Sequence, residues 1–175
     1  MTSDGNLRPV PTRITHRATW DVPAKDVYSE LVDADHINAR LAELGGNDPA
    51  LLEHDVDASG ARLTLRQAVP AEFLPSVIRR FTGGDLVLDR VETWRPRDTG
   101  GYEGTVEVTV RGLPGSLSGT QRLTDSGGGS VTEIDGQASV NVPMVGSRVE
   151  GVVVEQVGAL LDAEDDFTRR RLAQG

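Results

Sequence analysis

Strict two-residue alternation of apolar and polar side chains is the feature that most constrains the fold of this chain. Residues 102–111, YEGTVEVTVR, show it most clearly. Because successive side chains of a β-strand point to opposite faces, this segment predicts a strand with one buried face and one solvated face. The apolar face carries Tyr102, Val106, Val108 and Val110, and the polar face carries Glu103, Thr105, Glu107, Thr109 and Arg111.

Six other segments follow the same pattern, and short turns join most of them. They lie at residues 12–20, 51–59, 60–69 and 85–96 and, as two strands, within residues 115–142. Ser59-Gly60 and the run Gly127-Gly128-Gly129 separate consecutive strands and predict hairpins. The chain is therefore expected to form an antiparallel sheet of about seven strands with one apolar face.

Helical periodicity replaces the alternation at two main places. Residues 21–46 predict two short helices after the first strand, the second of which ends at Gly45-Gly46. Residues 145–167, VGSRVEGVVVEQVGALLDAEDDF, predict a long C-terminal helix. Its apolar stripe comprises Val145, Val149, Val152, Val153, Ala159, Leu160, Ala163 and Phe167, and Gln156 falls near the centre of that stripe. Because the apolar face of a sheet must be covered, we expect an α+β fold in which this helix lies over the sheet.

The connection PAEFLPSVIRRFTGG, residues 70–84, is longer than a hairpin needs. Phe73, Leu74, Val77, Ile78 and Phe81 recur in it at helical spacing, which predicts a short amphipathic segment. Two interpretations stay open, a lid over a cavity mouth and a small hydrophobic cluster. Arg79-Arg80, on the opposite side of the segment, adds a weaker third one, contact with a membrane.

Length and composition narrow the classes of partner. With 175 residues, the chain predicts one domain over residues 12–173, after a polar, mobile leader at residues 1–11. The net charge of −9 argues against nucleic acid and anionic membrane as main partners, because both are polyanions. The chain has no cysteine, no run of 18 apolar residues and no signal-peptide pattern, so we expect a cytoplasmic protein without stable membrane insertion.

Four segments resemble the START and Bet v 1-like superfamily, also called SRPBCC or helix-grip proteins, and most closely a bacterial family of unknown function within it. They are THRATWDVPAKDVYSELVD, RRFTGGDLVLDRVETW, LPGSLSGTQRLT and VNVPMVGSRVEGVVVEQVGALLDAEDDF. The resemblance implies a curved antiparallel sheet whose concave face is covered by the long C-terminal helix, around a hydrophobic cavity. Such cavities take lipid-like or polycyclic ligands. Superfamily members include lipid carriers, hormone receptors, polyketide aromatases and cyclases, and co-chaperones, and fold alone does not choose among them.

The primary hypothesis is therefore the binding of a hydrophobic small molecule or lipid, without a cofactor. Alternation along the strands and angular position on the helices assign its candidate contacts. The polar contacts are Gln156, His16 and Tyr102. The apolar wall comprises Val149, Val153, Leu160, Trp94, Phe73 and Phe81. The competing interpretation of Gln156 is that its side chain bonds a nearby backbone group or points to the edge of the helix. The competing interpretation of His16 is a hydrogen-bonded core residue.

The first alternative function is an enzyme of the aromatase or cyclase kind. In it His16 or Glu92 would move protons, since a Glu92 desolvated beside Trp94 would have a raised pKa. The strand face of Glu92 and Trp94 is ambiguous, because Val87 and Val91 favour the opposite face, and a structural or surface role is favoured for Glu92. No HxH or HxxxH spacing joins the three histidines, His16, His36 and His54, so no metal site is predicted.

The second alternative is a protein-interaction module resembling the co-chaperones. It would expose an apolar patch and have a cavity too small for a ligand. Gly151 and Gly158 on the far side of the long helix leave two interpretations open, a homodimer surface and close packing by the two short helices.

Overall fold

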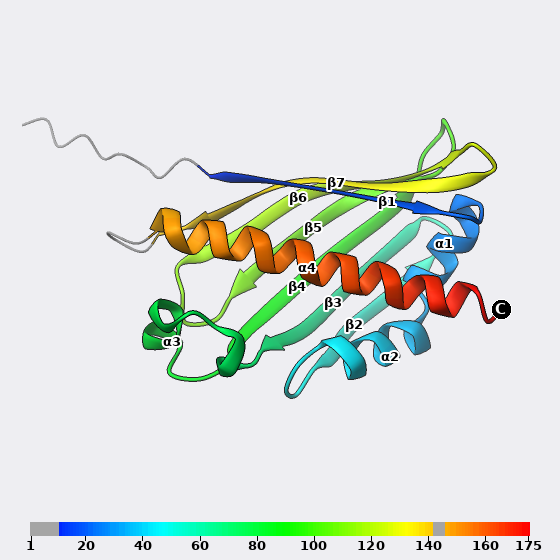
Figure 1. Cartoon of the computed structure of the whole chain (residues 1–175). Coiled ribbons are helices and arrows are strands. Elements are labelled where there is room, and N and C mark those ends of the chain that lie inside the picture. The colour runs from blue at the N-terminus through cyan, green and yellow to red at the C-terminus, as the bar shows by residue number, and fades with distance from the viewer. Residues whose placement is uncertain (1–10, 142–145) are drawn as a thin grey trace, which may run out of the picture.

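The seven predicted strands form one antiparallel sheet in the computed structural model, which describes residues 11–141 and 146–175 (Figure 1). The predicted leader, apart from Pro11, lies outside the described residues. The strands, in spatial order, are β1 (Thr12–Trp20), β7 (Gly129–Val140), β6 (Gly115–Ser126), β5 (Tyr102–Val110), β4 (Leu86–Pro96), β3 (Gly60–Val69) and β2 (Ala50–Asp57). Strands β2 to β7 thus form a meander, and β1 returns to pair with β7.

The β6–β7 hairpin shows why the turn residues lie where they do. Gly127 and Gly128 adopt φ angles of 58° and 89°, a left-handed conformation that costs glycine little and other residues more. The register that follows pairs Ser126 with Gly129 and continues to Gly115 opposite Val140. This register fixes which side chains of the two strands share a face.

Four α-helices accompany the sheet in the residues that the structure describes. They are α1 (Ala24–Leu31), α2 (Ala34–Leu44), α3 (Ser76–Thr82), which follows a 3₁₀ turn η1 (Ala71–Phe73), and α4 (Gly146–Leu172). The Asp33 carboxylate caps α2 by accepting a hydrogen bond of 2.8 Å from the His36 backbone N–H, and the helix ends at Gly45 as predicted. Figure 1 shows α4 crossing the sheet, with α1 and α2 near its C-terminal end and α3 near its N-terminal half.

The face of α4 that is buried differs from the predicted stripe. Gln156 is exposed, whereas Glu150, Glu164 and Thr168 are buried, so the prediction that Gln156 lies at the centre of the buried face is wrong. The buried face shares Val149 and Phe167 with the predicted stripe. It also takes in the three polar residues, which are held by partners on other elements. Val145, another residue of the predicted stripe, lies outside the described residues.

Glu150 shows how such a polar residue is held. Its carboxylate accepts hydrogen bonds from the Thr12 hydroxyl at 2.8 Å and from the Val140 backbone N–H at 3.1 Å. The first described turns of α4 are thereby fixed to the ends of β1 and β7. A carboxylate that accepts two hydrogen bonds can be buried without a large penalty.

The apolar core forms three separate clusters on the side of the sheet that α4 covers. One gathers Trp20, Val27, Trp94 and Leu123 under α1, and another gathers Ile37, Leu41, Leu63 and Leu65 under α2. The third joins Leu74, Ile78, Leu86, Val140 and Val149 near α3. The concave face between these clusters is where the candidate site lies.

No helix in the part of the chain that the structure describes is long and apolar enough to cross a membrane.

Candidate ligand-binding site

Four charged side chains are buried together between the three apolar clusters. Arg90 and Glu92 come from β4, Arg40 comes from α2 and Glu164 comes from α4. Each of the four residues is 7% exposed or less. We call this group the charge quartet.

The quartet is held by short contacts around Arg90. Its Nη1 donates to Glu164 Oε1 at 2.9 Å and Oε2 at 3.0 Å, while its Nε lies 2.7 Å from Glu92 Oε1 in an ion pair. Gln67 Nε2 also donates to Glu164 Oε1, at 3.4 Å. Arg40 stands further off, with Nη1 3.9 Å from Glu164 Oε2 and Nη2 4.0 Å from Glu92 Oε1.

Two positive and two negative groups make the quartet electrically neutral. Burial works to raise the pKa of Glu164, but Arg90 and Arg40 outweigh it and hold that pKa below its usual range. Burial likewise works against the charge on Arg90, yet Glu164 and Glu92 raise its pKa above the ordinary value. Arg90 and Glu164 are therefore both charged at neutral pH.

The quartet has hydrogen-bonding capacity that the described residues do not use. Arg40 Nε and Nη2 are buried without an aligned hydrogen-bond partner in residues 11–141 and 146–175, whereas Arg90 Nε and Glu92 Oε1 are poorly aligned but lie 2.7 Å apart in their ion pair. Trp94 Nε1, two residues along β4 from Glu92, shares this property with Arg40. A buried polar atom left unpaired costs about 1–3 kcal/mol, so such a concentration marks a site and not a well-packed core.

The concave face beside the quartet is apolar and only partly covered. Arg90 lies opposite Val108 on β5, and Val108 lies opposite Leu117 on β6. Both apolar residues are half-buried although neighbouring strands flank them on both sides. The middle of the concave face is therefore accessible from the side of α4.

Two glycines extend this accessible surface toward β7. Glu92 lies in a row of inward positions that runs Leu63, Glu92, Val106, Gly119, Gly136 and Ile14 across six strands. A Cβ on Gly119 would come within 2.9 Å of the Asp135 carbonyl oxygen, so close approach of β6 and β7 requires glycine there. The same two glycines leave the concave face without side chains next to Val106.

His16 points inward, as predicted, but contacts α4 and not the quartet. Its Nε2 lies 2.6 Å from Asp165 Oδ2, and its Nδ1 lies 3.9 Å from Asp162 Oδ1. Burial raises the pKa of Asp165, against the effect of the hydrogen bond with His16. The sequence spacing predicted no metal site, yet His16, Asp162 and Asp165 each offer one ligand atom within 4.8 Å of the others, and Asp162 is exposed.

The predicted aromatic contacts belong to a separate cluster under α1. Tyr102 stacks on Tyr28 with ring centroids 3.9 Å apart, and Trp94 meets Tyr28 edge-on at 6.3 Å. The structure also resolves the ambiguous face of β4, since Trp94 and Glu92 both point inward and are buried. Tyr102 and Trp94 therefore lie at the α1 end of the concave face.

The predicted contacts on α3 and α4 divide into buried and exposed ones. Val149 is buried against Leu74 and Ile78, and Val153 and Leu160 are half-buried. Phe73 and Phe81 are 65% and 52% exposed, so the prediction that they share the inward face of Leu74 and Ile78 is wrong. The reason is local, because the chain forms a 3₁₀ turn before a helix of only seven residues and no single helical stripe runs through residues 73–81.

Sequence reasoning missed Arg40, Arg90, Gln67 and Glu164 as site residues. A signal did exist for β4, where Arg90, Glu92 and Trp94 occupy alternate positions and so share one face. Charged residues are expected on the solvent face of a strand, because they are rarely buried unless they are paired. Only partners distant in the sequence, such as Glu164 for Arg90, make that face an inner one.

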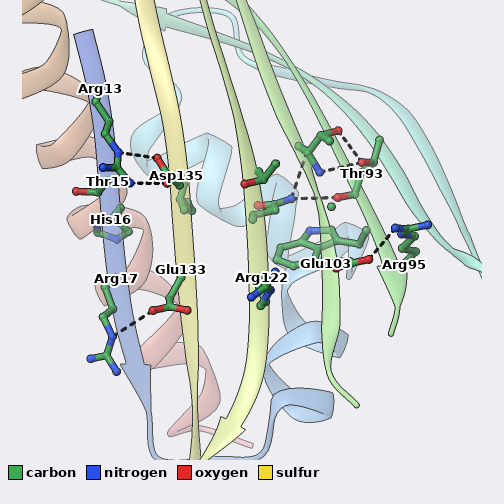
Figure 2. Close-up of a pocket in the computed structure, with 16 residues that line it drawn as sticks. Arg13, Thr15, His16, Arg17, Thr93, Arg95, Glu103, Arg122, Glu133 and Asp135 are labelled. Carbon is green, nitrogen blue, oxygen red and sulfur yellow. Dashed lines mark hydrogen bonds and ion pairs between the residues drawn. The ribbon is translucent and has the colours of Figure 1, made fainter. Parts of the chain in front are cut away.

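A hollow of about 1020 Å³ lies over strands β1, β7, β6, β5 and β4 (Figure 2). Most side chains around it alternate with those that face α4, so they point to the opposite side of the sheet. One row reads Arg17, Glu133, Arg122, Glu103 and Arg95 across five strands. Its ion pairs, such as Arg95 with Glu103 at 2.7 Å, are largely solvated and each stabilises the fold little. This hollow is a polar outer surface and not the predicted apolar cavity.

Comparison with known proteins gives a family match over nearly the whole chain. Residues 15–172 match a family described as "Protein of unknown function (DUF2505)". One relative is the uncharacterized protein Rv0481c of Mycobacterium tuberculosis, 27% identical over 168 residues that cover 91% of this chain and 95% of the relative.

Solved structures share the architecture at low sequence identity. TTHA0849 from Thermus thermophilus has a TM-score of 0.61 at 14% identity, over 90% of this chain and 97% of that chain. Norcoclaurine synthase from Thalictrum flavum has a TM-score of 0.61 at 16% identity, over 100% and 94%. Human STARD10 has a TM-score of 0.61 at 11% identity, over 97% and 66%. The chain therefore belongs to the DUF2505 family of proteins of unknown function, and it has the helix-grip fold of its START and Bet v 1-like structural neighbours.

Proposed function

We propose that this protein binds a hydrophobic small molecule or lipid-like ligand between the concave face of the sheet and α4. The observation that carries the proposal is the half-buried pair Val108 and Leu117 in the middle of the concave face. Apolar side chains in the centre of a sheet, beneath a helix, are normally buried by the core. Here they are accessible, and a ligand would remove them from water.

The surroundings of this pair suit an apolar ligand body. Val153 and Leu160 on α4, across from the pair, are half-buried. The apolar cluster near α3, which contains Val149, borders them. Burying about 200 Å² of apolar surface would contribute about 5 kcal/mol to binding. The charge quartet supplies the sparse polar groups that fix orientation in ligand pockets.

Binding fits the geometry better than acid–base catalysis does. An aromatase or cyclase-like enzyme would need His16 or Glu92 to face a substrate with a group able to take a proton. Both ring nitrogens of His16 face carboxylates on α4, and Glu92 is engaged by Arg90. The superfamily resemblance implies a ligand cavity but does not choose between the two functions.

The proposal is tested by filling the concave face. The double variant Val108→Phe with Leu117→Phe adds bulk at one cross-strand pair, and Thr109→Phe with Ser116→Phe adds the same kind of bulk at the adjacent pair, which is exposed on the outer face. Fluorescence titration with the neutral apolar probe N-phenyl-1-naphthylamine measures affinity. We expect the inner variant to bind roughly tenfold more weakly than the unmodified protein, and the outer variant to bind unchanged.

Circular dichroism and thermal unfolding of both variants serve as the control for folding. The absence of saturable probe binding to the unmodified protein would contradict the proposal, and so would an equal effect of the two variants.

A further inference from the structure

Arg40 and Glu92 face one another across a gap that no direct hydrogen bond closes. Arg40 Nη2 lies 4.0 Å from Glu92 Oε1, whereas a hydrogen bond between such groups needs about 3 Å. Arg40 Nη2 is buried and has no aligned hydrogen-bond partner in the part of the chain that the structure describes. Glu92 Oε1 is buried too; its close partner is Arg90 Nε at 2.7 Å, and a carboxylate oxygen can accept a second hydrogen bond. Arg40 and Glu92 are 3% and 6% exposed, so bulk solvent does not satisfy them.

The gap has the dimensions of one bridging oxygen atom. An oxygen at about 2.8 Å from both Arg40 Nη2 and Glu92 Oε1 fits between atoms 4.0 Å apart. That oxygen must accept a hydrogen bond from the guanidinium and donate one to the carboxylate. A hydroxyl group does both, whereas an ether or carbonyl oxygen only accepts and an ammonium only donates.

Charge balance further restricts the group. Arg40 and Arg90 already balance Glu92 and Glu164, so the quartet is neutral without a ligand. A carboxylate beside Glu92 would add an uncompensated negative charge to a buried site, which is costly. A neutral group adds no charge.

The neighbouring surface gives the ligand body a place to lie. Val106, which pairs with Glu92, is followed across the sheet by Gly119 and Gly136, and neither glycine has a side chain to fill the space. Val108 and Leu117 lie in the adjacent row of inward positions and border the strip formed by Val106 and the two glycines. An apolar body can thus extend from the quartet toward β7 beneath α4.

We propose that Arg40 and Glu92 bind a neutral hydroxyl group of the apolar ligand, so that the protein selects alcohols over carboxylates and ethers of the same size. The inference rests on the proposed function and names the class of ligand. Arg90 and Glu164 act as positioning residues. Arg90 Nε forms the ion pair with Glu92 on the same strand, and Arg90 Nη1 donates a hydrogen bond to Glu164 on α4.

Three compounds with similar chains test the selection: 1-decanol, its isomer 1-methoxynonane, and decanoate. Each is titrated against the bound probe N-phenyl-1-naphthylamine at neutral pH. Hydrogen bonds to two charged groups predict that 1-decanol displaces the probe at a concentration roughly tenfold lower than either competitor. If 1-decanol is no better than 1-methoxynonane, the gap holds a water molecule only and the hydroxyl assignment is wrong.

A charge-conserving double variant identifies the residues responsible. Arg40→Met with Glu92→Met removes one charge of each sign and leaves the Arg90–Glu164 pair intact. It should still bind the probe but lose the preference for 1-decanol. The matched control, Arg95→Met with Glu103→Met, removes a largely solvated ion pair on the outer face and should keep the preference.

The outcomes separate this inference from the proposed function. Probe binding without alcohol selection in the unmodified protein overturns the hydroxyl assignment alone, whereas absence of probe binding overturns both. Retention of the alcohol preference in the Arg40→Met with Glu92→Met variant would also overturn the assignment. The comparison of the three compounds needs only the unmodified protein, so it decides the matter even where a variant fails to fold.

Discussion

Glu164 connects most of the buried polar groups of the molecule. Its side chain accepts from Arg90 and Gln67, and its backbone carbonyl accepts from the Thr168 hydroxyl at 3.0 Å. Thr168 Oγ1 in turn lies 3.3 Å from His36 Nε2. The polar interior therefore continues from the quartet to His36, a fully buried histidine on α2.

We predict that His36 makes the protein more stable as pH rises from about 5 to 7. Burial, with help from Arg40 and Arg171, lowers the pKa of His36 below its ordinary value, against the opposing effect of Glu30. The unfolded chain therefore binds the proton more readily, and the stabilisation is present above the unfolded pKa of about 6.5 and is lost as pH falls below it. Urea unfolding at several pH values measures the effect.

His36→Gln provides the comparison, because it removes the titrating group. Its free energy of unfolding should vary less between pH 5 and 7 than that of the unmodified protein. A separate measurement, the NMR titration of the His36 ring, should give a pKa below the ordinary range. A pKa above that range, or identical pH profiles for both proteins, would contradict the account.

At the scale of elements, periodicity predicts the strands and helices but not which side chains of α4 are buried. Apolar spacing is a local signal, so it identifies the seven strands, the two short helices and the long helix. Burial of Glu150 and Glu164 depends on Thr12, Val140 and Arg90, which lie far away in the sequence. No local pattern contains that information, and the apolar spacing consequently puts Gln156, which is exposed, at the centre of the buried face.

The orientation of α4 is tested by two truncations in the same helix. Val149→Ala should lower the free energy of unfolding by about 2 kcal/mol, because it removes two buried methyl groups and leaves a cavity near Leu74 and Ile78. Gln156→Ala should change it by less than about 0.5 kcal/mol, because the side chain is exposed. Chemical denaturation of both variants measures the difference, and a larger loss for Gln156→Ala would require α4 to be rotated.

At the scale of the whole molecule, a curved sheet, a long helix and three separate apolar clusters leave a partly accessible surface between them. The fold class was predictable from the sequence. Strand alternation, turn residues and the four segments that resemble the START and Bet v 1-like superfamily all indicated it. The candidate site was predictable only in part. Val149 and Val153 were placed on the inward side, but the face of Trp94 and Glu92 stayed open and the buried charges were not predicted, because their pairing depends on tertiary structure.

Native mass spectrometry of the purified protein, followed by organic extraction, tests the central claim most directly. The account predicts a species heavier than the 18.7 kDa chain by one small molecule, and release of a neutral, largely apolar compound that carries a hydroxyl group. A bare chain from every source, together with failure to bind an added apolar alcohol, would contradict it.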